Sequence, residues 1–324
     1  MNLADAQSAS SARAKPSAAL LHALIALMVI VWALNFVVGK IALRQIPPLV
    51  LPGVRIGIAA IFFIPIYWWD RRGHTHRPFR RADLPQLIVV ALCGITFNQF
   101  FFIAGLYRTS VGHMAVFFAM TPVIVLLLAV IIGQEKLTFP KLAGMLIAMT
   151  GVLLVELSSQ RGSRIATPLG DLFAFLGNLA FSIYTVAGKH VASRYGSIPV
   201  NTLAYAIGAA TLLPISWAAR GSFHAAEISA AAWLSLLYMV IFGSVVAYLI
   251  YYYALMHIPA SRVAAFTYAE PVLAAILGFL LLGEPVTWAL GVGGAMVLAG
   301  VWIAERPGRP PGRAVLESHS HTGV

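Results

Sequence analysis

Charged residues are scarce in this chain. Only 10% of its 324 residues are Asp, Glu, Lys or Arg, whereas 60% are hydrophobic. Soluble domains carry about 25% charged residues, so a soluble fold of this length could not cover its surface. Ten apolar helices of about 20 residues each would use roughly 200 positions, close to the hydrophobic content. The composition therefore predicts an all-α polytopic membrane protein.

Residues that build redox, metal and nucleotide sites are also missing. Cys93 is the only cysteine, which excludes an intrachain disulfide and a cysteine-based metal motif. The sequence has no His-Glu-x-x-His motif and no phosphate-binding loop, so we expect no metal, no cofactor and no direct use of ATP. No aspartate lies in mid-span, and His22, His113, His190 and His257 all sit at the ends of hydrophobic segments. An intramembrane serine protease, which needs a Ser–His pair at membrane depth, is therefore disfavoured.

The chain contains an internal repeat with an offset of 149 residues. Two of its stretches show eleven identities in an ungapped register, including a proline and a loop glutamate. The identical pairs are Leu106/Leu255, Ala115/Ala264, Phe117/Phe266, Pro122/Pro271, Val123/Val272, Glu135/Glu284, Thr138/Thr287, Gly144/Gly293, Gly151/Gly300, Val152/Val301 and Glu156/Glu305. Apolar composition alone would not match the polar and proline positions, so we expect two structurally similar halves.

Ten hydrophobic segments divide evenly between these halves. They are residues 20–43, 49–69, 84–107, 111–132, 139–156, 168–191, 199–218, 229–256, 260–282 and 287–304. Five fall in a first repeat, residues 20–156, and five in a second, residues 169–305, with disordered tails at 1–19 and 306–324. Because five is odd, the two repeats must cross the membrane in opposite directions. Inverted repeats are typical of secondary transporters, whose halves open a midplane site to each side in turn.

The distribution of Lys and Arg predicts the orientation. With both termini inside, fifteen of the counted Lys and Arg residues are cytoplasmic and six are external. The positive-inside rule then favours cytoplasmic termini in the cell inner (plasma) membrane. The net charge of +11 is interpreted as a topology signal and an attraction to anionic lipid, not as a nucleic-acid surface.

Several motifs resemble the EamA-type drug/metabolite transporter superfamily. The run from Trp32 through Asn35 to Lys40, WALNFVVGK, resembles the first-helix motif of that family, and Arg55 near the start of the second span also fits. The segment 253–303 resembles the end of an EamA repeat through Glu270-Pro271, Gly283-Glu284 and Gly293…Gly300.

The first repeat matches the family motif less well than the second. The resemblance as a whole covers about residues 20–305. Within residues 104–156, Thr121-Pro122 stands in place of Glu-Pro and Gln134 in place of Gly. The resemblance implies a ten-helix exporter of amino acids, other small metabolites or drugs. The aromatic-rich spans make YddG-type aromatic amino-acid exporters the nearest group. In that family helices 1, 3, 4, 6, 8 and 9 line a central cavity, and helices 5 and 10 lie at the periphery.

Polar and aromatic residues at membrane depth mark a candidate substrate site. Polar groups there should face protein or a water-filled cavity. The candidate substrate-binding residues are Trp32, Asn35, Asn98, Gln99, Phe102, Thr121, Asn178, Ser182, Thr185, Tyr248, Tyr251 and Glu270. They predict a mostly aromatic cavity suited to a small amphipathic solute. The alternative is that the Ser, Thr and Asn side chains join packed helices.

Two features of this set suggest mechanism. Glu270 is the only acidic residue well inside a predicted span, so it must be paired, protonated or hydrated. Its expected roles are to bind an ammonium group or to carry a coupling proton, and the alternative is a protonated packing residue. Pro122 and Pro271 lie inside predicted spans and should kink them. They are the candidate hinges, with static kinks as the alternative.

Three basic residues receive mainly structural interpretations. Arg55 is expected to pair with helix-end carbonyls or a lipid headgroup. Lys40 and Lys189 occupy equivalent repeat positions near helix ends, where they snorkel to headgroups or attract a substrate carboxylate.

The sequence thus predicts a secondary transporter that exports small amphipathic metabolites, with amino acids including aromatic ones as expected substrates. Alternating access through a central cavity is the expected mechanism. The alternative function is an intramembrane enzyme acting on lipid or peptide. Expected partners are the small-molecule substrate and the lipid bilayer, with no nucleic acid, and a monomer is the working expectation.

Overall fold

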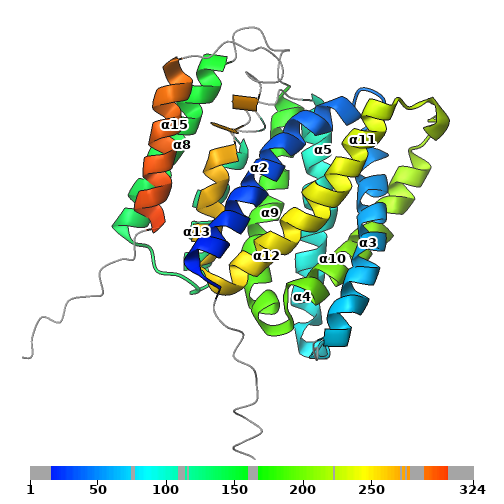
Figure 1. Ribbon diagram of the computed structural model, residues 1–324, viewed down its shortest axis with the longest axis horizontal. Coiled ribbons are helices and arrows are strands. Elements are labelled where there is room, and N and C mark those ends of the chain that lie inside the picture. Colours follow the sequence, from blue (N-terminus) through cyan, green and yellow to red (C-terminus); the bar gives the residue numbers. More distant parts are fainter. Residues whose placement is uncertain are drawn as a thin grey trace, which may run out of the picture.

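The computed structural model describes residues 16–73, 77–108, 114, 117–159, 167–221, 223–270, 272–273, 276–277 and 288–305. All regular structure in these ranges is helical (Figure 1), as predicted. Helices long and apolar enough to cross a membrane span Ala18–Ala42, Leu51–Gly73, Arg81–Arg108, Pro168–Tyr195, Ser197–Ala218 and Ala230–His257. Shorter apolar helices span Phe117–Ile131, Phe139–Leu154 and Gly291–Ala304. Each of these helices overlaps a predicted span.

Some of these spans are composites of regular segments. The α-helices are α2 (Ala18–Ala42), α3 (Leu51–Gly73), α4 (Leu84–Ala91), α5 (Asn98–Arg108), α7 (Thr121–Ile131), α8 (Phe139–Ser159), α9 (Pro168–Tyr195), α10 (Ser197–Ala218), α11 (Ala230–Tyr238), α12 (Ala247–His257), α13 (Ala260–Ala265) and α15 (Trp288–Glu305). Short 3₁₀ turns are η1 (Arg81–Asp83), η3 (Ala225–Glu227) and η5 (Phe266–Tyr268). Wide π-helical turns, η2 (Leu92–Phe97) and η4 (Met239–Val246), join α4 to α5 and α11 to α12. Because π-helical turns are concentrated at functional sites, these two segments indicate that a functional site lies near the middle of the bundle.

Hydroxyl side chains begin several helices. Ser17 accepts a hydrogen bond from Leu20 N at 3.2 Å, and Ser229 caps α11 in the same way. Thr167 caps α9 and also donates to the carbonyl of Arg108 at 2.9 Å, which ties the end of α5 to the start of α9. These caps satisfy backbone groups that a helix end leaves free.

The predicted kink at Pro122 has a different form from the one expected. The chain turns at Met120, and α7 begins at Thr121, so Pro122 occupies the first helical turn. A proline there removes no internal hydrogen bond, so the bend lies at the turn before Thr121 and does not come from a backbone hydrogen bond that Pro122 removes. The break comes first and the proline follows it. Pro271 lies outside the described residues, and the disordered tails predicted at 1–19 and 306–324 fall largely outside them as well.

The break recurs at the equivalent place in the second half of the chain. α13 ends at Ala265 and gives way to the 3₁₀ turn η5, just before Glu270. With the 149-residue offset, the turn before Thr121 and the turn before Glu270 are counterparts. Both predicted spans are therefore discontinuous at matching positions.

Further contacts follow the repeat. Lys40 donates to the carbonyl of Leu106, and Lys189 donates to the carbonyl of Leu255 at 3.2 Å. Lys189 also donates to the carbonyl of Ile258 at 2.6 Å. In each half a lysine from the first helix therefore caps the carboxyl end of the third. Both lysine ammonium groups are therefore engaged by backbone carbonyls, which favours a capping role over binding of a substrate carboxylate.

α8 and α15 form a pair at one edge of the bundle, apart from α2, α9 and α12 (Figure 1). Small residues let their backbones approach closely, since a Cβ on Gly144 would lie 2.5 Å from the carbonyl of Gly300. Their buried residues form a cluster separate from the main core. The pair corresponds to the peripheral fifth and tenth helices that the family resemblance implies.

Candidate functional site

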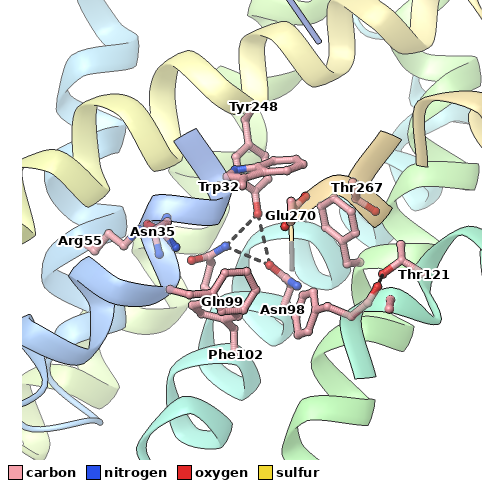
Figure 2. Close-up of a pocket in the computed structure, with 14 residues that line it drawn as sticks. Trp32, Asn35, Arg55, Asn98, Gln99, Phe102, Thr121, Tyr248, Thr267 and Glu270 are labelled. Carbon is pink, nitrogen blue, oxygen red and sulfur yellow. Dashed lines mark hydrogen bonds between the residues drawn. The ribbon is translucent and has the colours of Figure 1, made fainter. Parts of the chain in front are cut away.

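A cavity of about 60 Å³ lies where α2, α3, α5, α9 and α12 meet the broken helices around Thr121 and Glu270. Its walls comprise Trp32, Asn35, Phe36, Arg55, Asn98, Gln99, Phe102, Phe118, Ala119, Thr121, Phe181, Tyr248, Thr267 and Glu270. Ten of these fourteen side chains are labelled in Figure 2. Seven of these side chains are aromatic or aliphatic, seven are polar or charged, and every one of the polar and charged side chains is buried. This is the lining expected of a small-molecule site.

A hydrogen-bond network crosses the cavity. The Nε2 of Gln99 donates to the Tyr248 hydroxyl at 2.8 Å and to the Oδ1 of Asn98 at 2.9 Å (Figure 2). The Tyr248 hydroxyl donates to the same Asn98 oxygen at 3.2 Å. Gln99 and Tyr248 lie 149 positions apart, so they are counterparts in the two halves. The network therefore joins the halves at equivalent positions of their third helices.

Trp32 forms the aromatic centre of the site. Its ring packs edge-on against Phe181 at 5.6 Å and against Tyr248 at 5.7 Å. The indole Nε1 donates to the carbonyl of Gly243 at 3.3 Å. That carbonyl belongs to the π-helical turn η4, where the wider turn changes the backbone hydrogen-bonding pattern. Trp32 and Phe181 are also repeat counterparts, so the aromatic contact again joins the two halves.

Two charged side chains border the same cavity. Arg55 is only 2% exposed, and its Nε donates to the Ser244 hydroxyl at 2.9 Å. Glu270 is 6% exposed. The Nη1 of Arg55 and the Oε1 of Glu270 have no hydrogen-bond partner among the described residues. Since buried polar groups nearly always have partners, these two atoms are candidates for contact with a ligand.

The break before α7 is held by Asn178. Its Nδ2 donates to the carbonyl of Phe117 at 2.6 Å, and its Oδ1 accepts from the Thr121 hydroxyl at 2.5 Å. Thr121 thus has its hydroxyl engaged although its side chain borders the cavity. Asn178 itself is fully buried outside the cavity wall.

Eight of the twelve candidate residues line the cavity, and four do not. Asn178, Ser182, Thr185 and Tyr251 are absent from its wall. Ser182 donates to the carbonyl of Asn178, and Thr185 shares a 2.6 Å hydrogen bond with Tyr251. Asn178 and Thr185 therefore join α9 to neighbouring helices, which is the alternative that the sequence left open, whereas Ser182 bonds within α9.

The cavity also has walls outside the candidate set, namely Phe36, Arg55, Phe118, Ala119, Phe181 and Thr267. Phe36 lies one helical turn after Trp32, and Thr267 lies three residues before Glu270, so helical spacing could have found both. Phe181 could have been found as the repeat counterpart of Trp32. The expectation that Arg55 pairs with helix-end carbonyls or a headgroup is wrong, since its guanidinium donates to the Ser244 hydroxyl and is buried deep in the bundle.

The equivalent positions in the second half are filled by tyrosines. Tyr184 and Tyr251 are the counterparts of Asn35 and Phe102, and both are fully buried. Their rings stack at 6.4 Å, and Tyr184 also packs against Tyr252 at 4.8 Å. One half of the chain thus contributes most of a polar cavity, while the other presents a packed aromatic cluster at the same positions.

A helical bundle with broken helices around a buried polar cavity is typical of membrane transport proteins. The chain belongs to the EamA-like transporter family, whose domain matches twice, over residues 20–157 and 168–305. It is therefore a multi-pass membrane protein, and the resemblance identified from its motifs is confirmed. The two matched segments agree with the repeat limits to within one residue.

Named relatives support the same class. An uncharacterized transporter of Archaeoglobus fulgidus is 29% identical over 282 residues, covering 87% of this chain and 97% of the relative. A probable amino-acid metabolite efflux pump of Salmonella typhimurium is 28% identical over 86% of this chain and 92% of its own length. A probable terminal-alkyne amino-acid exporter of Streptantibioticus cattleyicolor is 28% identical over 72% of this chain and 76% of its own length.

A crystal structure shares the fold. It superposes with a TM-score of 0.71 at 17% sequence identity, covering 89% of this chain and 97% of the other. At that identity the likeness concerns the fold alone. The family and its named relatives are transporters, which points away from the alternative of an intramembrane enzyme.

Proposed function

We propose that the protein is a secondary transporter that exports amino acids, including aromatic ones, by alternating access through the central cavity. It has ten spans in two inverted five-helix repeats, residues 20–156 and 169–305. It lies in the cell inner membrane with both termini cytoplasmic and catalyses no reaction. The observation that carries the proposal is a buried cavity whose aromatic walls hold unpartnered polar atoms.

The cavity lining supports a small amphipathic substrate. Aromatic rings offer an apolar surface, while Gln99 Oε1 and Asn35 Oδ1 have no hydrogen-bond partner among the described residues. Oriented polar groups in an apolar wall provide binding and specificity together. Because small-molecule sites occupy about 300–1,000 Å³, a cavity of about 60 Å³ must widen to admit an amino acid.

The unequal packing of the two halves supports alternating access. In a protein built of similar halves, exchange of their two conformations opens the site to one side and then to the other. Here a cavity lies beside Asn35 and Phe102, whereas their counterparts Tyr184 and Tyr251 are packed together. The breaks before Thr121 and Glu270 provide points where these helices can bend, with Pro122 and Pro271 beside them.

Exchange by the purified protein tests this function. Proteoliposomes loaded with unlabelled tryptophan or phenylalanine should take up the labelled amino acid by counterflow, and uptake should saturate. We expect Gln99→Ala and Tyr248→Ala to reduce it at least tenfold, because each breaks the network that joins the halves at the cavity. Thr202→Ala is the matched control, since among the described residues its hydroxyl bonds only to the Ile198 carbonyl of its own helix.

The control variant should transport like the wild type. Absence of counterflow for every amino acid in a screen would contradict the proposed substrate class. Turnover of a lipid or peptide by the same preparation, without transport, would restore the enzymatic alternative.

A further inference from the structure

Arg55 and Glu270 are a basic and an acidic side chain buried beside one cavity. They come from α3 and from the broken helix after η5, and Figure 2 shows them well apart in the labelled group. No ion pair links them within the described residues, where the ion pairs formed are Lys141–Glu135 and Arg194–Asp83. Each therefore lacks a direct countercharge.

Such an arrangement is unfavourable unless something else meets the charges. A charged side chain inside a membrane span is energetically costly unless it is paired, hydrated or neutralised. The Ser244 hydroxyl engages only the Nε of Arg55 and leaves Nη1 without a partner. Glu270 likewise keeps Oε1 unpartnered at the wall of the cavity.

The fold does not require either charge. Across the 149-residue offset the counterpart of Arg55 is Ala204, and the counterpart of Glu270 is Thr121. Ala204 and Thr121 are both buried, so the same architecture is built at these positions with neutral side chains. If Arg55 and Glu270 had a purely structural role, one half of the protein would depend on buried ionisable side chains while the other half would not.

From the geometry we propose that Arg55 and Glu270 are the two poles of a site for a zwitterion: Arg55 binds the carboxylate and Glu270 binds the ammonium group of a free amino acid. The guanidinium fork matches a carboxylate. The aromatic walls receive the side chain, and Trp32 and Tyr248 are part of this lining (Figure 2).

This inference rests on the proposed transport function and narrows its substrate class. A site with two opposite poles selects against amines that lack the carboxylate and against acids that lack the ammonium group, because one buried charge would stay unpaired. It also selects against amino acids blocked at either end. General affinity for apolar aromatic compounds would show none of this selectivity.

Competition by matched analogues tests the two poles. Tryptophan counterflow is measured with unlabelled tryptophan, tryptamine and 3-indolepropionate as competitors, and phenylalanine, phenethylamine and 3-phenylpropionate form a second set. We expect the intact amino acid to compete at least tenfold better than either analogue, which is about 1.4 kcal/mol per analogue.

Variants assign each pole. Arg55→Gln should close the gap between tryptophan and tryptamine, while Glu270→Gln should close the gap between tryptophan and 3-indolepropionate. Ligand-induced thermal stabilisation of the purified variants provides the same comparison when transport is lost, and Arg55→Lys keeps the charge where Arg55→Gln fails to fold. Thr202→Ala should retain both gaps.

The outcomes separate this inference from the proposed function. If the wild type exchanges tryptophan but accepts all three ligands equally, the two-pole site is wrong while the transporter stands. The same holds if a charge-neutralising variant weakens all ligands by one common factor. If no amino acid is bound or exchanged at all, the proposed function itself fails.

Discussion

At the scale of single residues, two glycines allow the halves to interlock. A Cβ on Gly94 would lie 1.9 Å from the Tyr184 ring, and one on Gly243 would lie 2.6 Å from the Oδ1 of Asn35. Gly94 and Gly243 are repeat counterparts, as are Asn35 and Tyr184. In each half, the glycine of a π-helical turn therefore receives a side chain from the first helix of the other half.

This packing predicts a large effect for a small substitution. Gly94→Ala should destabilise the protein by about 1–3 kcal/mol or more, because the buried Tyr184 ring has little room to move. The thermal midpoint in detergent measures this loss. Gly291→Ala is the control, since a Cβ there would have no neighbour within 4 Å.

A second variant checks the cause. In a Tyr184→Ala background, Gly94→Ala should lower the thermal midpoint less than it does in the wild type, because the clashing ring is then absent. Equal thermal midpoints for Gly94→Ala and Gly291→Ala would show that the Tyr184 ring does not pack closely against Gly94.

The sequence could predict much of the site at this scale because polar residues are rare in apolar spans. Trp32, Gln99 and Glu270 were recognised by type and depth, and all three line the cavity. What sequence could not decide is which polar residues face the cavity and which face a neighbouring helix. Thr185 bonds to Tyr251 instead, since its direction depends on how α9 is rotated against α12.

At the scale of elements, Glu135 connects three segments. Its carboxylate accepts from the backbone N of Ser261 at 3.0 Å and from the Ser261 hydroxyl, and it pairs with Lys141 at 2.6 Å. Glu135 lies after α7, Lys141 in the first turn of α8, and Ser261 in the first turn of α13. A carboxylate at a helix start is favourable because it meets free N–H groups and the helix dipole.

The pKa of Glu135 reflects these contacts. Burial alone would raise the pKa of this carboxyl, but hydrogen bonds from Lys141 and Ser261 together outweigh burial and hold the pKa below its ordinary value. Since the folded pKa is the lower one, the stabilisation is fully present above the unfolded pKa of about 4.3 and is lost as the pH falls through the folded value.

We therefore expect Glu135→Gln to lower stability at neutral pH by about 1 kcal/mol, roughly 2–4 °C in thermal midpoint. The difference from wild type should shrink as the pH falls below about 4.3. Glu227→Gln, at an exposed glutamate of η3, serves as the control and should match wild type throughout. A gap for Glu135→Gln that is constant from pH 3 to pH 7 would contradict this account.

At the scale of the whole molecule, the repeat carried most of the predictive value. Pro122, Glu135 and Gly144 are among the residues that recur after 149 positions, and this recurrence defined the two halves. The family model matches residues 20–157 and 168–305. Hydropathy placed the spans because the bilayer requires long apolar helices. The π-helical turns escaped prediction, since they depend on contacts between the halves rather than on local composition. A bend near Pro122 and Pro271 was predicted, but not that the break would precede each proline.

The last prediction concerns how the molecule sits in the membrane. The arginines of residues 70–83 should hold that loop in the cytoplasm, which places residues 157–167 outside if the spans alternate as proposed. Cys93 is the single native cysteine, so Cys93→Ala provides a background without thiols. In that background, Ser163→Cys should react with a membrane-impermeant thiol reagent in intact cells, whereas Thr75→Cys should react only after the membrane is permeabilised. The reverse pattern would invert the orientation and, with it, the side toward which the cavity beside Asn35 lies.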